Sequence, residues 1–273
     1  MSADTRVFDV LRIAAAMCFI GHGAFGLIGK AGWVVYFGVA GIGPGWAYTL
    51  MPIVGLVDIL LGISLLVWPT KAACAYMAVW GLWTAMLRPL AGQGLAECLE
   101  RAGNYGVPLA LLLVGWATFP RGGWFARMTP PLLDAQGAGR VAWVLRVTTA
   151  TLLFGHGLLA ATGKPLLLLH LYNAGVGDHG LSTATMLARQ GGFEIALAMA
   201  VLLSPGRGLL LFVFAWKIGT ELLFPLAGDR MWEVVERGGS YGAPLALMLL
   251  TRVALSAGAA KSSWSGAPAP APA

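Results

Sequence analysis

The sequence predicts an all-α integral membrane protein made of two tandem four-helix bundles. Hydrophobic residues make up 58% of the 273 positions and charged residues 11%, whereas soluble domains carry roughly a quarter charged residues. The chain also contains an internal duplication, which indicates that one structural unit occurs twice. Long apolar runs in each copy then predict eight transmembrane helices, four per copy.

The duplication is clearest in two blocks. Glu97–Leu113 matches Glu233–Leu249 at 11 of 17 positions, and Leu11–Lys30 resembles Leu145–Lys164. Polar residues that recur within such blocks are candidates for function or for helix packing. They are Arg12/Arg146, His22/His156, Lys30/Lys164, Glu100/Glu236, Arg101/Arg237 and Tyr105/Tyr241.

The apolar runs define the elements in chain order. A spanning helix needs about 20 residues, so the short stretches at 33–40 and 165–172 cannot span and are predicted to be interfacial or re-entrant pieces. Residues 1–130 and 131–256 form the two repeats, and the Ala/Pro-rich segment 257–273 is predicted to be a disordered cytoplasmic tail. The eight predicted spans are 7–28, 47–68, 71–90, 104–119, 141–160, 185–204, 207–226 and 241–256.

Basic residues predict the orientation. With the N-terminus inside, the cytoplasmic segments carry a net charge of +7 and the opposite segments +1. The positive-inside rule then places both termini in the cytoplasm of a bacterial-type inner membrane. Because each repeat has an even number of helices, the repeats share one orientation and are related by an axis along the membrane normal. The positive charge reflects this topology, and no basic patch for nucleic acid is present.

Two histidines, His22 and His156, recur with glycine on both sides. The glycines let a neighbouring backbone or ligand come close. Three interpretations are open: a helix-packing position that hydrogen-bonds across the interface, contact with a ligand such as a quinone, and haem ligation. Haem b is the least favoured, because it requires both imidazoles to converge on one ring.

Acidic residues recur midway along the second predicted helix of each copy, as Asp58 and Glu194. A carboxylate at bilayer depth is costly unless it is paired, protonated or exposed to a cavity. Each acid is therefore either a structural hydrogen-bond partner or a group that handles protons or substrate. We expect each histidine to share a polar pocket with the acid of its own copy.

One charged pair has no counterpart in the first copy. Lys217 and Glu221 lie four residues apart and so on one helical face, where the first copy has Gly81 and Ala85. They form either a self-neutralising pair or a site at which the second copy alone binds a charged or redox-active ligand.

Arginines and tyrosines near helix ends are further candidates. Arg101 and Arg237 each follow a glutamate, and they form either a solvated ion pair or a contact with an anionic headgroup or substrate. Arg88 precedes a proline that ends a predicted helix. Tyr105 and Tyr241 belong to the aromatic belt expected at a membrane boundary.

Motifs for metal binding and soluble-type catalysis are absent from the sequence. The three cysteines do not recur between copies and lack metal or redox spacing, with Cys98 expected in an outer loop. His170 and His179 have no evident counterpart and are expected in loops. No Walker, GxSxG or HExxH motif occurs, so the sequence predicts no metal site and assigns no catalytic residue.

The glycine-flanked histidine followed by GK, the acid in the second helix and the ERxGxYGxPLAL motif together resemble the DoxX-like membrane protein family, over about 10–119 and again over 141–256. The resemblance implies a small integral membrane protein, in some members linked to quinone-dependent oxidation, as in the DoxD-type subunit of thiosulfate:quinone oxidoreductase. Because family members usually have one unit, the tandem form implies a fused pseudo-dimer.

Two functional classes remain open, with a third that involves no chemistry. The first is a redox-complex subunit that binds a quinone or similar carrier between helices, with other membrane or extracytoplasmic subunits as partners. The second is a transporter or permease with its site at the repeat interface. The third is an assembly or anchoring subunit.

We predict that reporter fusions will place both termini in the cytoplasm and the segment that precedes the fourth span on the outer side. The charge difference of +7 against +1 is the reason. A C-terminal reporter that is active only outside the cytoplasm would contradict this topology.

Overall fold

The computed structural model describes residues 3–116, 123–130, 132–176 and 181–264, with side chains described between residues 4 and 251 of these ranges. These residues form helices and no strand. The predicted all-α class is therefore confirmed for the described part of the chain.

The first half has four long helices and three short helical segments. Thr70 caps the third long helix, because its hydroxyl accepts a hydrogen bond from the Ala73 amide at 3.1 Å. Gly29 ends the first helix with a φ of 67°, a conformation that glycine adopts at little cost. The segments are α1 (Ala3–Leu27), the 3-10 turn η1 (Ala31–Trp33), α2 (Val34–Val39), α3 (Pro44–Val67), α4 (Lys71–Leu90), α5 (Leu95–Leu99) and α6 (Ala102–Trp116).

The second half repeats this order. Gly163, which matches Gly29, ends its first helix with a φ of 72°. The fourth-span motif is preceded by a short helix in both halves, a feature that the sequence does not reveal. The segments are α7 (Ala135–Ala161), α8 (Pro165–Asn173), α9 (Thr183–Leu203), α10 (Arg207–Glu221), α11 (Leu223–Leu226), α12 (Trp232–Glu236) and α13 (Gly238–Trp264).

Five of the eight predicted spans are long and apolar enough to cross a membrane: α1, α3, α7, α9 and Arg207–Leu226, which covers α10 and α11. The other three predicted spans coincide with α4, α6 and α13, so the count of eight stays a prediction. Helix α13 continues past residue 257 to Trp264. The rest of the predicted tail, 265–273, lies outside the described residues.

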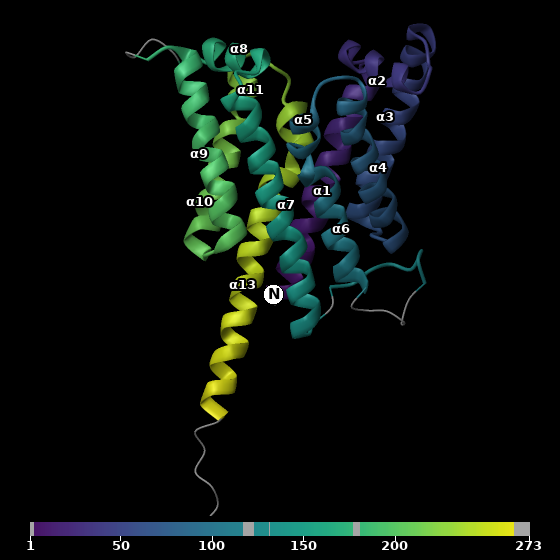
Figure 1. The fold of residues 1–273 in the computed structure, drawn as a ribbon. Coiled ribbons are helices and arrows are strands. Elements are labelled where there is room, and N and C mark those ends of the chain that lie inside the picture. Colours follow the sequence, from purple (N-terminus) through teal and green to yellow (C-terminus); the bar gives the residue numbers. More distant parts are fainter. Residues whose placement is uncertain (1–2, 117–122, 131, 177–180, 265–273) are drawn as a thin grey trace, which may run out of the picture.

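Helices α1, α6, α7 and α13 form the centre of the molecule, with α3 and α4 on one side and α9 and α10 on the other (Figure 1). The short helices α2 and α8 lie at the same end, which we call the loop end (Figure 1). The halves exchange partners there: α1 packs against α12 and α13, and α7 packs against α5 and α6.

Glycines permit this exchange at matching positions. A Cβ on Gly21 would lie 2.2 Å from the Glu236 nitrogen, and one on Gly155 would lie 2.3 Å from the Glu100 nitrogen. Small residues allow such close backbone approach between membrane helices. Each half therefore places the short helix before its fourth span against the first helix of the other half.

A second glycine pair marks the centre of this exchange. Gly103 of α6 and Gly239 of α13 occupy matching positions and contact each other, with a Cβ on Gly103 lying 2.7 Å from the Gly239 carbonyl carbon. The two glycines thus let α6 and α13 approach each other closely. Leu11, Leu111 and Leu145 belong to the large apolar core and are 0% exposed.

We predict that Gly103→Ala will lower the melting temperature of the detergent-purified protein. The added methyl group has no space at the α6–α13 contact, and overpacking of this kind typically costs about 1–3 kcal/mol. The matched control is Gly219→Ala in α10, where a Cβ would meet nothing within 4 Å. Equal losses in both variants would show that the close contact does not govern stability.

Candidate functional site

Each recurrent histidine is hydrogen-bonded to the acid of its own half. His22 Nδ1 lies 2.7 Å from Asp58 Oδ2, and His156 Nδ1 pairs with Glu194 Oε2. Both acids are buried, with Asp58 1% and Glu194 0% exposed. The predicted pairing is thus confirmed, and it satisfies the need of a buried carboxyl group for a partner.

The two carboxyl groups differ in the hydrogen-bond partners of the oxygen that does not contact the histidine. Glu194 Oε1 accepts a hydrogen bond from Trp216 Nε1 at 2.8 Å and lies 3.5 Å from Gln190 Nε2. Among the described side chains, the corresponding Asp58 Oδ1 has no hydrogen-bond partner. Aspartate is one methylene shorter than glutamate, and Val54 stands where the second half has Gln190.

The matching tryptophan of the first half is also unpaired. Trp80 corresponds to Trp216, and its buried Nε1 has no partner within the described part of the chain. A buried donor without an acceptor costs about 1–3 kcal/mol. The first half therefore retains an unsatisfied donor where the second half has a complete hydrogen-bond network.

Trp80 lines an apolar cavity of about 180 Å³, which we call the first-half cavity. Its walls come from α1, η1, α2, α3 and α4. His22 forms part of the wall and stacks on Trp33, with ring centroids 4.4 Å apart. The lining residues are His22, Trp33, Tyr36, Phe37, Ala40, Ile42, Met51, Val54, Trp80, Trp83, Thr84, Leu87 and Arg88.

A polar group stands at the edge of this cavity. Arg88 Nη1 donates to the Tyr36 hydroxyl at 2.6 Å, and that hydroxyl donates to Gln93 Oε1 at 2.8 Å. The guanidinium also lies 5.0 Å from the centre of the Tyr36 ring. Arg88 thus does more than precede the proline of α4, because its side chain joins α4 to α2 beside the cavity.

The matching cavity of the second half is nearly filled, with a volume of about 20 Å³. Leu167 replaces Trp33, and Phe224 replaces Arg88. His170 was expected in a loop without a counterpart, but it lies in α8 at the position of Tyr36. Its ring packs on Phe224 at 4.5 Å, and its Nε2 pairs with Asp229 at 2.6 Å. Side chains of the protein therefore occupy the space that is open in the first half.

Lys217 and Glu221 do pair, at 2.8 Å, but they are not an isolated pair. Arg237 Nε lies 2.9 Å from the other oxygen of Glu221. This acid therefore lies between the lysine of α10 and the arginine that precedes α13. The second half therefore uses Lys217 and Glu221 in a structural network, and the open cavity lies in the other half.

Ion pairs link the two halves at matching positions. Lys30 pairs with Glu233 at 2.9 Å, and Lys164 pairs with Glu97 at 2.7 Å. In the part of the chain that the structure describes, neither lysine forms an ion pair with an acid of its own half. The recurrence of both lysines and both glutamates was visible in the sequence, whereas their exchange between halves was not.

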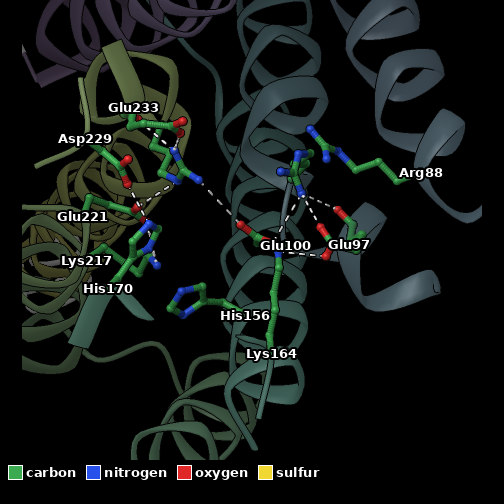
Figure 2. Close-up of polar contacts among 12 residues, drawn as sticks. Arg88, Glu97, Glu100, His156, Lys164, His170, Lys217, Glu221, Asp229 and Glu233 are labelled. Atoms are coloured by element: carbon green, nitrogen blue, oxygen red, sulfur yellow. Dashed lines mark hydrogen bonds and ion pairs between the residues drawn. The ribbon is translucent and has the colours of Figure 1, made fainter. Parts of the chain in front are cut away.

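The recurrent arginines complete the network, and Figure 2 labels their acidic partners Glu97, Glu100, Glu221 and Glu233. Arg101 lies 3.2 Å from Glu97 and 3.3 Å from Glu100. Arg237 pairs with Glu233 and lies 4.0 Å from Glu100. The expectation of solvated pairs with the preceding glutamate is wrong for Arg237, because it has no ion pair with Glu236 among the described residues and is largely buried.

Electrostatics keeps this network charged. Burial opposes the charged form of Glu100, but Arg101, Lys164 and Arg237 hold its pKa well below the usual value. Burial likewise disfavours the charged form of Arg237, and the carboxylates of Glu221 and Glu233 nevertheless raise its pKa. Each charge thus depends on partners from both halves.

The remaining candidates have structural positions. The Tyr241 hydroxyl donates to the Val234 carbonyl and ties α13 to α12. Tyr105 packs beside the central apolar core. Cys98 was expected in an outer loop, but it lies in α5, is 3% exposed and contacts Met86 through sulfur at 3.5 Å.

The described side chains contain no group of three metal-ligating residues. His22 and His156 line different cavities, and each is bonded to its own acid. This geometry does not bring the two imidazoles onto one haem. The chain matches no protein-family model, no curated protein and no solved structure, so the DoxX-like resemblance stays a prediction.

We predict that acid will destabilise the protein partly through Glu233. Burial opposes its charge, but Arg237 and Lys30 lower its pKa from 4.5 to about 2. A lowered folded-state pKa means that the stabilisation is complete above about pH 4.5 and is lost as the pH falls toward about 2. In acid-unfolding experiments, Glu233→Gln should be less stable at neutral pH and lose less stability across this window. An unchanged acid slope would contradict the assignment.

Proposed function

We propose that this protein is an integral membrane subunit of a quinone-linked redox system, related to the DoxX-like family. The first-half cavity is the binding site for the ring of a quinone or a similar lipid-soluble carrier. The observation that carries this proposal is the difference between Trp80 and Trp216: one indole donor is unpaired at an open cavity, and its counterpart is bonded in a filled one.

The cavity has the composition that such a ligand requires. Binding sites for lipophilic molecules are mostly apolar, with a few polar groups that orient the ligand. Trp33 and Trp83 provide flat apolar walls, and the buried Trp80 Nε1 is a donor without a partner, among the described residues, beside the cavity. Arg88 and Tyr36 supply further donors at the edge of the cavity.

His22 and Asp58 suit proton transfer to or from such a ring. Because His22 Nδ1 is bonded to Asp58, its Nε2 is the nitrogen that remains for a ligand. Neutral His22 can accept one of the two protons that a quinol releases on oxidation, Asp58 then stabilises the imidazolium, and the second proton passes to solvent. In the reverse direction, protonated His22 donates to a reduced carbonyl oxygen. The two electrons pass to or from a partner redox subunit.

We further propose that the chain has eight spans, in two four-helix units of the same orientation. The matching contacts of Gly21 and Gly155 and the meeting of Gly103 with Gly239 support this arrangement. The charge difference of +7 against +1 supports an inner-membrane location with cytoplasmic termini. The charged network then lies toward the outer face, where an extracytoplasmic partner would bind.

A transporter is the second candidate, and the axis between the copies argues against it. Transport requires a polar path through both leaflets. Beyond the Gly103–Gly239 contact, the described parts of α6 and α13 carry mostly buried apolar residues. They include Val107, Ala110, Leu111, Ala243, Ala246 and Leu247, all at most 1% exposed. A non-catalytic assembly subunit would not need an open cavity with an unpaired donor.

We predict opposite effects from two matched substitutions. Trp80→Phe should weaken binding of a short-chain quinone about five-fold, the value of one hydrogen bond near 1 kcal/mol, with little loss of thermal stability. Trp216→Phe should leave binding unchanged and lower stability, because it removes the bond to buried Glu194. Isothermal titration calorimetry and thermal unfolding measure the two quantities.

A second substitution pair addresses the histidines. His22→Gln should weaken quinone binding at least ten-fold, whereas His156→Gln should leave it unchanged, because only His22 lines the open cavity. If His156→Gln removes binding and His22→Gln does not, the site is in the second half. If neither variant affects binding, the histidines are packing residues.

A further inference from the structure

A second, polar cavity of about 390 Å³ lies at the loop end, and we call it the vestibule. Residues from both halves line it, including the pairs Lys30–Glu233 and Lys164–Glu97. It shares Trp33, Tyr36 and Arg88 with the first-half cavity. The vestibule is therefore a separate space that adjoins the apolar site through three side chains.

Most charges around the vestibule are matched by protein partners. The two lysines pair across the halves at 2.9 and 2.7 Å. Arg101 and Arg237 each lie within 4.0 Å of at least two carboxylates. Asp229 pairs with His170 at 2.6 Å. Among the described charged residues that line the vestibule, one basic and one acidic side chain have no ion pair within 4.0 Å.

These two side chains are Arg88 and Glu236. Within the described ranges, Arg88 has no carboxylate within 4.0 Å; Nη1 donates only to the neutral Tyr36 hydroxyl, and Nε has no partner. Glu236 is 7% exposed and has no basic group within 4.0 Å among the described residues, so Arg101 and Arg237 act on it only at longer range. Leaving a buried charge without a partner is strongly unfavourable.

We propose that the vestibule binds a small zwitterion. Its anionic carboxylate or phosphate group pairs with Arg88, and its ammonium group pairs with Glu236. A guanidinium suits bidentate contact with either anion. Such a ligand supplies both missing counter-charges and adds no net charge to a cavity whose other charges are already paired.

The other half cannot form the same site. The position that matches Arg88 holds Phe224, and the residue that matches Glu236 is Glu100, which pairs with Arg101 at 3.3 Å. The vestibule therefore contains one guanidinium and one carboxylate of this kind, although the chain contains two copies of the unit. Two sources carry the required chemistry: a free α-amino acid and the phosphoethanolamine headgroup of a lipid.

The test uses the full chain, delipidated in detergent. Calorimetric titrations with glycine, ethanolamine and acetate compare a zwitterion with each of its charged parts, and native mass spectrometry compares bound phosphatidylethanolamine with phosphatidylglycerol. The variants are Arg88→Phe, which introduces the residue of the second half, and Glu236→Gln, which preserves size. Asp229→Asn is the control, since Asp229 lies on the same wall with its own partner. Arg88→Gln replaces Arg88→Phe if the latter does not fold.

We expect glycine or phosphatidylethanolamine to bind at least ten-fold more tightly than the singly charged probes or phosphatidylglycerol. Glu236→Gln and the Arg88 variant should each weaken that binding at least ten-fold, and Asp229→Asn should not. Binding of glycine identifies a free amino acid as the source, and binding of phosphatidylethanolamine alone identifies a headgroup. Acetate binding that equals glycine binding and resists Glu236→Gln would overturn the proposal, as would the absence of binding by every probe. Quinone binding, measured separately on the same sample, tests the other proposal.

Discussion

Buried charge is the constraint on which the rest of the structure depends. A lysine or glutamate inside a largely apolar helical protein needs a partner at short range, and here the partners of Lys30 and Lys164 belong to the opposite half. The Lys30 and Lys164 side chains are 34% and 20% exposed, so water screens these pairs in part, whereas the glutamate partners are more deeply buried. The exchange therefore locks the two halves together at the loop end, and the cavities are built on this rigid frame.

The glycines make that exchange sterically possible. Gly21 and Gly155 let the backbone of α12 and α5 reach the first helix of the opposite half. This approach brings Glu97 of α5 and Glu233 of α12 within ion-pair distance of Lys164 and Lys30. In each copy, a glycine of the first helix thus permits a close backbone contact with the other half, and this contact brings the ion pair into range.

Function is expected where the two copies differ. The copies share the histidine–acid pairs and the crossed ion pairs, so these features stabilise both. Trp33, Tyr36 and Arg88 keep the first-half cavity open and polar at its edge, whereas Leu167, His170 and Phe224 fill the matching space. The two halves of the duplicated chain therefore differ at this site, and the filled space of the second half can be compared directly with the open cavity of the first.

Much of this could be predicted from the sequence. The repeat identified the recurrent polar residues, and the cost of a carboxyl group at bilayer depth predicted that Asp58 and Glu194 would pair with the histidines. The partner exchange could not be predicted, because a repeat shows which residues recur and not which copy supplies each partner. The pairing of Lys217 with Glu221 could be predicted from their spacing, but the contribution of Arg237 could not, because it depends on the packing of α10 against α13.

The open cavity also could not be predicted from the sequence. Its volume depends on side chains from five helical segments at once. The role of Trp80 follows only from the contrast with Trp216, whose indole nitrogen donates to Glu194. Matching tryptophans at the same spacing as the other repeats were nevertheless present, so a position-by-position comparison of the copies is the signal that would have identified them.

The most direct test of the central claim is photolabelling of the purified protein with an azidoquinone, followed by mapping of the modified peptides. The account predicts label on first-half segments that line the cavity, 33–54 and 80–88, and competition by unlabelled quinone. It predicts no competed label on the matching segments 167–190 and 216–224. Equal labelling of both halves, or labelling confined to the second, would contradict the assignment of the carrier to the first-half cavity.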